Sequence, residues 1–120
     1  MLKVELLYAG AKFNIYQTVG TKADVLTVLS DLEQSNPSEH EKAVALLASV
    51  AQAGPPFNSQ KSRKTSFDGL LELKPGGYRI PYFYHPNLSA VIVLTHMFKK
   101  CPPKEQTKEL KYADNLRKQL

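Results

Sequence analysis

Residues 69–100 contain three short apolar segments separated by two stretches of turn-forming residues. The segments are 70–73, 78–84 and 90–96, and the turns are Pro75-Gly76-Gly77 and His85-Pro86-Asn87. Proline fixes one backbone angle of a turn, whereas glycine and asparagine tolerate left-handed positions. The spacing therefore predicts a three-strand meander, around which the other elements have to be arranged.

The N-terminal half predicts a β-hairpin followed by two helices. Segments 4–7 and 13–18 are expected to be short strands joined at Ala9-Gly10-Ala11. Apolar residues at helical spacing then predict an αα-hairpin interrupted at Asn36-Pro37. Thr21 or Asp24 is expected to cap the first helix, and Asn36 or Ser38 the second.

A polar, basic connection, 57–66, leads into the meander, and a last helix is expected after Pro102-Pro103. The predicted order is β-β-α-α-β-β-β-α. One α+β domain, 1–120, with an antiparallel sheet accounts for the whole chain.

Composition excludes several other classes of protein. Hydrophobic residues make up 42% of the chain and charged residues 22%, as in an ordinary globular domain. The longest apolar run, 90–94, is too short to cross a bilayer, and the first residues do not resemble a signal peptide. A lone cysteine, Cys101, allows neither an internal disulfide nor a cysteine zinc cluster. We expect a cytoplasmic protein with no membrane segment, no metal and no cofactor.

Charge is distributed unevenly along the chain. Residues 1–60 have four Lys/Arg and six Asp/Glu, a balance of −2, whereas residues 61–120 have twelve and five, a balance of +7. This asymmetry favours a polyanion as partner. The alternative is a basic face that contacts only solvent.

Two adjoining stretches resemble a known protein family. GLLELKPGGYRIPYF, from Gly69, and HMFKK, from His96, with the following PPKEQTKELKYAD resemble the hairpin and ending of the phage Gp49-like, HigB-type branch of the RelE/HigB toxin superfamily. The order of elements agrees with a RelE/ParE-like fold. The resemblance implies a toxin of a type II toxin–antitoxin module, a metal-independent mRNA endonuclease that acts on the ribosome. Its partners would be the ribosome, mRNA and a cognate antitoxin, of the helix-turn-helix HigA type.

The resemblance also implies roles for individual residues. Arg79 matches the arginine that RelE-type toxins use against the scissile phosphate, and the planar guanidinium suits that role. Lys99 and Lys100 match the family's cationic pair, of which one is expected to contact phosphate. Lys74 retains a cation that related toxins have, whereas Leu70 and Glu72 replace cations.

Several of these residues have a second interpretation. Arg79 is either a phosphate ligand or an ion-pair partner of Glu72. Glu72 is either a catalytic base or a partner of Arg79 or Lys74. His96 is either a proton donor or acceptor or a structural residue at a strand end.

Further residues are candidates for binding RNA without a part in catalysis. Tyr82 either stacks on a base or packs in the core. The loop cations and Lys104, on the last helix, suit an RNA backbone; the loop cations are Lys61, Arg63 and Lys64.

The non-basic residues Leu70 and Glu72 leave two other functions open. One is a ParE-like toxin that binds a target such as gyrase without cutting RNA. The other is a phage relative without catalytic activity that acts as a regulatory binding partner.

Overall fold

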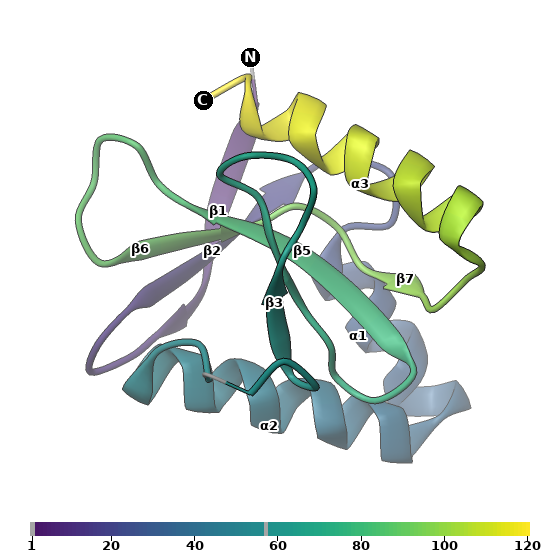
Figure 1. Cartoon of the computed structure of the whole chain (residues 1–120). Helices are drawn as coiled ribbons and strands as arrows, with labels where there is room; N and C mark the ends of the chain where they lie inside the picture. The colour runs from purple at the N-terminus through teal and green to yellow at the C-terminus, as the bar shows by residue number, and fades with distance from the viewer. Residues whose placement is uncertain (1, 57) are drawn as a thin grey trace.

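The computed structural model describes residues 2–56 and 58–120 (Figure 1). The described residues form three helices, α1 (Val25–Ser35), α2 (Pro37–Ala53) and α3 (Pro103–Arg117). They also form seven strands: β1 (Lys3–Ala9), β2 (Asn14–Val19), β3 (Ser62–Lys64), β4 (Leu71–Leu73), β5 (Tyr78–Tyr84), β6 (Val91–Leu94) and β7 (Phe98–Lys99). Phe57, the first residue of the expected connection, lies outside the described residues.

The sheet contains both predicted substructures. Its strand order is β1-β2-β6-β5-β4-β3, so the N-terminal hairpin and the β4-β5-β6 meander are confirmed. The two join through β2 and β6, which pair in parallel from Asn14↔Val91 to Gln17↔Leu94. The sheet is therefore mixed rather than wholly antiparallel, because a long crossover containing both α1 and α2 connects β2 to the meander.

Two short strands were not predicted. β3 forms within the expected basic connection and pairs with β4, where Arg63 lies directly opposite Glu72. Opposite charges in such a pair stabilise the register. β7 pairs with the start of β5, so Lys99 lies opposite Tyr78 and Phe98 opposite Arg79.

Helices α1 and α2 begin where capping residues predict. The Asp24 side chain accepts a hydrogen bond from the Thr27 amide at 2.9 Å, and the Asn36 side chain accepts one from the Glu39 amide at 3.4 Å. Pro37 occupies the first turn of α2, where its missing N–H costs nothing.

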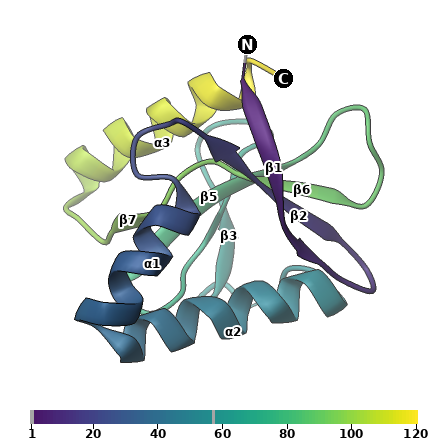
Figure 2. The same cartoon turned by 180° about the vertical axis from the view of Figure 1, so that it is seen from behind.

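Helices cover both faces of the sheet. α1 and α2 lie together on one face, and α3 lies on the other (Figures 1 and 2). The core on the α1 and α2 side includes Ile15, Leu47 and Tyr82, and the core on the α3 side includes Leu70, Phe83 and Leu110. The described helices include none that is both long and apolar enough to span a membrane.

Candidate functional site

The turn between β4 and β5 is held in place from two sides. The Gly77 amide donates a hydrogen bond to the Glu39 carboxylate at 3.0 Å, which attaches the turn to α2. The Lys100 amide donates to the Gly77 carbonyl at 2.8 Å, which attaches the segment after β7 to the same turn. The turn and Lys100 therefore form one rigid corner of the molecule.

Arg79 points back over this corner. Its Nη1 donates hydrogen bonds to the carbonyls of Gly76, at 3.0 Å, and Tyr78, at 2.7 Å. Only 9% of the surface of Arg79 is exposed. Within the described residues, every fully buried side-chain nitrogen has a hydrogen-bond partner. The remaining donors of Arg79 make no hydrogen bond to the described residues, so they reach solvent. The guanidinium is oriented by the backbone and still has donors free for a ligand.

Lys74 lies beside this arginine. Its ammonium donates a hydrogen bond to the Ser59 carbonyl at 2.8 Å. Burial lowers the pKa of Lys74, and the nearby charges of Arg63, Arg79 and Lys100 lower it further, while Glu72 acts in the opposite direction. Lys74 and Arg79 flank the paired residues Leu73 and Ile80 at the turn end of the hairpin. Arg63 lies opposite Glu72, and the Lys100 backbone is bonded to Gly77. We call Arg63, Lys74, Arg79 and Lys100 the cationic cluster.

Glu72 is the anion next to the cationic cluster, and it is fully buried. Its carboxylate accepts a hydrogen bond from Arg63 Nε at 2.9 Å and two from the Gln106 amide, at 3.0 and 3.3 Å. The ion-pair partner of Glu72 is therefore Arg63, on β3, rather than Arg79 or Lys74. Glu72 orients Arg63 and ties α3 to β4.

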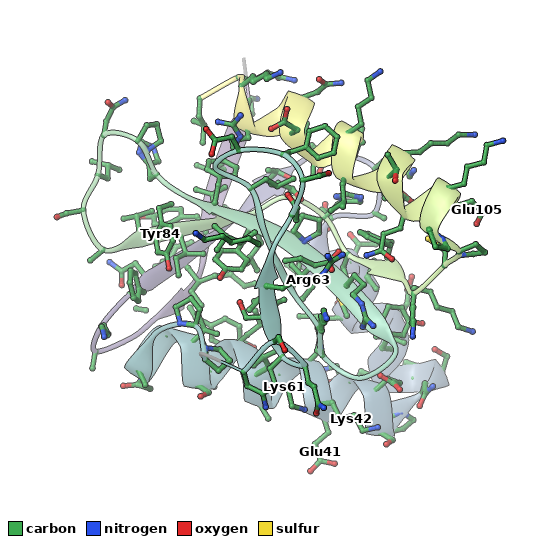
Figure 3. All side chains as sticks on the ribbon, viewed as in Figure 1. Glu41, Lys42, Lys61, Arg63, Tyr84 and Glu105 are labelled. Atoms are coloured by element: carbon green, nitrogen blue, oxygen red, sulfur yellow. The ribbon has the colours of Figure 1, made fainter. Side chains whose placement is uncertain are left out.

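The other predicted cations are spread over the surface. Because directly opposite residues share a face of a sheet, Lys99 lies on the face of Tyr78, away from Arg79. Lys61 is exposed and lines a shallow depression over α2 together with Lys42 (Figure 3). Lys64, at the end of β3, and Lys104, in the first turn of α3, are also exposed. Of the predicted cations, the structure brings together Arg63, Lys74, Arg79 and Lys100.

A family comparison covers most of the elements that build this corner. Residues 30–118 match the family described as Phage derived protein Gp49-like (DUF891). The match runs from within α1 to the end of α3, so it contains the whole cationic cluster. The chain belongs to the phage-derived Gp49-like family. A search of curated proteins found no match.

Two positions distinguish the cluster of this Gp49-like chain from the pattern expected of RelE-type toxins. Leu70 and Glu72, the positions where the sequence resemblance implies cations, are both buried, with 1% and 0% of their surface exposed. Leu70 packs with Phe83 and Leu110 beneath α3. Neither position is on the surface of this Gp49-like protein, so a cation there would be buried. The cation nearest Glu72 comes from the unpredicted strand β3 instead.

His96 lies in the interior of the Gp49-like fold. Its ring is fully buried, contacts the Phe98 and Tyr112 rings, and has hydrogen-bond partners in Thr95, at 3.1 Å, and Glu109, at 3.2 Å. Burial lowers the pKa of His96, and this outweighs the opposite effect of Glu109. The imidazole is held within the core and is not presented to the cationic cluster.

Tyr82 is also enclosed by the Gp49-like core. It is fully buried, its hydroxyl lies 3.0 Å from Ser62 Oγ, and burial raises the pKa of Tyr82 to about 12. The next tyrosine on that face, Tyr84, is 47% exposed. Tyr84 rather than Tyr82 presents an aromatic ring to solvent.

The sequence contained little signal for two parts of the site. Glu39 is far from the meander in sequence, and only the fold brings its carboxylate to Gly77. Nothing in the sequence around Gln106 marks it as a partner of Glu72, because their contact depends on how α3 packs against the sheet. Across residues 2–56 and 58–120, no three His, Cys, Asp or Glu side chains are grouped so as to hold a metal ion.

Proposed function

We propose that this Gp49-like chain is the toxin of a type II toxin–antitoxin module and that it cleaves mRNA on the ribosome without a metal ion. The observation that supports this proposal is the cationic cluster at the β4–β5 turn. Three cations, Arg63, Lys74 and Lys100, accompany the backbone-oriented Arg79 within the segment that matches the family. Such a site suits a phosphodiester.

Cleavage of RNA without a metal uses the substrate's own 2′-hydroxyl as the nucleophile. The 2′-hydroxyl loses its proton to solvent water as its oxygen attacks the adjacent phosphorus. The bond from phosphorus to the 5′-oxygen breaks, which leaves a 2′,3′-cyclic phosphate and a 5′-oxygen that needs a proton. Much of the rate then comes from alignment and from stabilising charge on the phosphoryl oxygens. The free donors of Arg79 supply that stabilisation, and Lys100 adds a second positive charge.

Lys74 is suited to the proton transfer that the leaving group needs. Its lowered pKa makes the ammonium a stronger acid than an ordinary lysine, so it donates a proton to the departing 5′-oxygen more readily. Glu72 and His96 are committed to internal hydrogen bonds, and we assign neither of them to this step.

The surroundings of the cluster fit a ribosomal substrate. Lys61, Lys64 and Lys104 are exposed, and cations of this kind bind RNA backbone without regard to sequence. Together they would hold the toxin against ribosomal RNA while the cluster meets the mRNA. A small helix-turn-helix antitoxin would neutralise the protein in the cytoplasm.

Inducible expression tests the proposal. The wild type is expected to arrest growth and translation, and Arg79→Ala is expected to relieve the arrest because it removes the phosphate ligand. Lys74→Arg is also expected to relieve it, since arginine keeps the charge but does not release a proton near neutral pH. Lys108→Ala, which removes an exposed cation of α3, is the matched control and stays toxic.

Circular dichroism of each purified variant shows whether it is folded. A wild-type protein that is folded and harmless would contradict the toxin assignment. Arrest that persists in folded Arg79→Ala would point to the non-nuclease alternatives. If Arg79→Ala relieves the arrest but Lys74→Arg does not, Lys74 is not the proton donor and the toxin assignment still stands.

A further inference from the structure

A groove with a volume of about 410 Å³ lies at the side of the sheet, next to the cationic cluster. It is bounded by the loop between β1 and β2, the segment after α2, strand β3 and the end of β5. Its lining includes Lys12, Phe13, Arg63, Lys64, Tyr82 and Tyr84. We call it the β3 groove.

The floor of the β3 groove is aromatic. The Phe13 and Tyr84 rings lie 5.8 Å apart at an angle of 49°, and the buried Tyr82 ring meets Tyr84 edge-on at 6.1 Å. These contacts support Tyr84 from beneath, while 47% of its surface stays exposed. A large ring held by its neighbours and open to solvent is a platform on which a planar group can stack.

The rim of the β3 groove is cationic. Lys12, Arg63 and Lys64 contribute to its lining, and no aspartate or glutamate does. Within the described residues, the ammonium groups of Lys12 and Lys64 make no hydrogen bond or ion pair. Two unpaired cations beside an aromatic floor are complementary to a ligand that combines planar groups with negative charges.

The β3 groove is continuous with the cationic cluster through one residue. Arg63 lines the groove and also belongs to the cluster, where it lowers the pKa of Lys74. Its position is fixed by the hydrogen bond to Glu72. By register, Arg63 lies on the sheet face of Glu72 and Pro81, whereas Tyr84 lies on the other face with Tyr82. The edge strand β3 contributes to both sites. A chain with regularly spaced phosphates can therefore occupy both sites at once.

We propose that the β3 groove holds an unstacked base of single-stranded RNA next to the nucleotide whose phosphate lies in the cationic cluster. The base stacks on Tyr84, and Lys12 and Lys64 contact the flanking phosphates. The choice of RNA as the ligand rests on the proposed function. Stacking on an aromatic side chain accepts any base, so the groove positions the strand without selecting a sequence.

Binding of a short, unstructured, fluorescently labelled RNA at low salt tests this inference. Tyr84→Ala is expected to bind the RNA roughly tenfold more weakly than the wild type, because it loses one stacking contact. Tyr84→Phe keeps the ring and is expected to bind like the wild type. Lys12→Ala is expected to reduce the slope of log K against log[salt] by about one, as for any lost phosphate contact. Lys111→Ala, an exposed cation of α3, is the matched control and keeps the full slope.

Two outcomes overturn the inference. One is folded Tyr84→Ala that binds the RNA as tightly as the wild type, and the other is wild-type protein that binds no single-stranded RNA. The growth assay with Arg79→Ala separates this inference from the proposed function. If Arg79→Ala relieves the arrest and Tyr84→Ala binds RNA like the wild type, only the proposed role of the β3 groove is rejected. If Tyr84→Ala binds RNA weakly and Arg79→Ala stays toxic, the nuclease proposal is rejected and the proposed role of the β3 groove stands.

Discussion

The Glu72 carboxylate is enclosed by groups from two segments that are distant from it in sequence. Arg63 reaches it from β3 and Gln106 from α3, and none of its surface is exposed. Taking one partner away from a buried charge is costly, because the remaining charge is left without compensation. Glu72 therefore fixes both the position of Arg63 and the docking of α3, which is a positioning role.

His96 gives stability a dependence on pH. Glu109, Tyr112 and Lys22 are the titratable groups around it, and burial lowers the pKa of the imidazole below its ordinary value of 6.5. At a pH between the folded and unfolded pKa values of His96, the unfolded chain binds more protons than the folded one. The stabilising contribution of neutral His96 is therefore fully present above pH 6.5 and falls as the pH drops below it. The fall is expected to be at most about 1.4 kcal/mol for each unit of pH.

Urea denaturation at pH 7.5 and 5.5 measures this effect. The free energy of unfolding of the wild type is expected to decrease between the two values, and that of His96→Gln to change less. Glu109 does not interfere in this range: burial acts to raise its pKa, but hydrogen bonds from Lys22 and His96 outweigh this and lower it below 4.5. Equal pH dependence in the two proteins would show that His96 is not the group responsible.

At the scale of single elements, the β4–β5 turn depends on Gly76. Its φ of +58° is left-handed, and an added Cβ would overlap the Glu39 carboxylate that holds Gly77. The Gly76 carbonyl also accepts a hydrogen bond from Arg79. This turn therefore connects the backbone of the hairpin, helix α2 and the proposed phosphate ligand.

Gly76→Ala is expected to lower the free energy of unfolding by about 2 kcal/mol or more, from backbone strain together with displacement of Glu39. Gly20 is the matched control, because its φ is +75° and nothing lies within 4 Å of an added Cβ. Gly20→Ala is expected to cost only the strain, about 1 kcal/mol. Denaturation curves measure both values. Equal losses would show that the contact with Glu39 contributes nothing.

The elements differed in how well the sequence predicted them. The hairpin, both helix caps and the meander depend on local signals, namely proline, glycine, capping residues and hydrophobic spacing, and these predictions are confirmed. β3 has no such signal, because a short polar segment becomes a strand only when β4 offers it an edge. The parallel pairing of β2 with β6 likewise depends on the path of the whole chain.

The site residues were predictable to the extent that local sequence determines them. The β4–β5 turn is flanked in sequence by Lys74 and Arg79, and the pairing of β7 with β5 brings Lys100 to it. The structure therefore brings these three cations together. The positions of Glu72 and His96 depend on which face α3 covers, and that is a tertiary property. Phe13 and Tyr84 meet because β2 and the end of β5 flank β6, which no local pattern reveals.

At the scale of the whole molecule, the basic second half of the chain supplies five of the seven described strands and helix α3. The balance of +7 over residues 61–120 includes all four members of the cationic cluster. The start of β1 lies close to the end of α3 in both views of the fold (Figures 1 and 2). The cationic cluster is built from β3, the β4–β5 hairpin and the residue after β7.

Mapping the 5′ ends of cellular mRNA after induction tests the central claim most directly. If the cationic cluster cleaves mRNA on the ribosome, wild-type expression will produce new 5′ ends inside translated regions at a fixed position within the codon. The same map from Arg79→Ala will lack those ends. Growth arrest with intact messages, or identical cuts in the folded Arg79→Ala variant, would contradict the account.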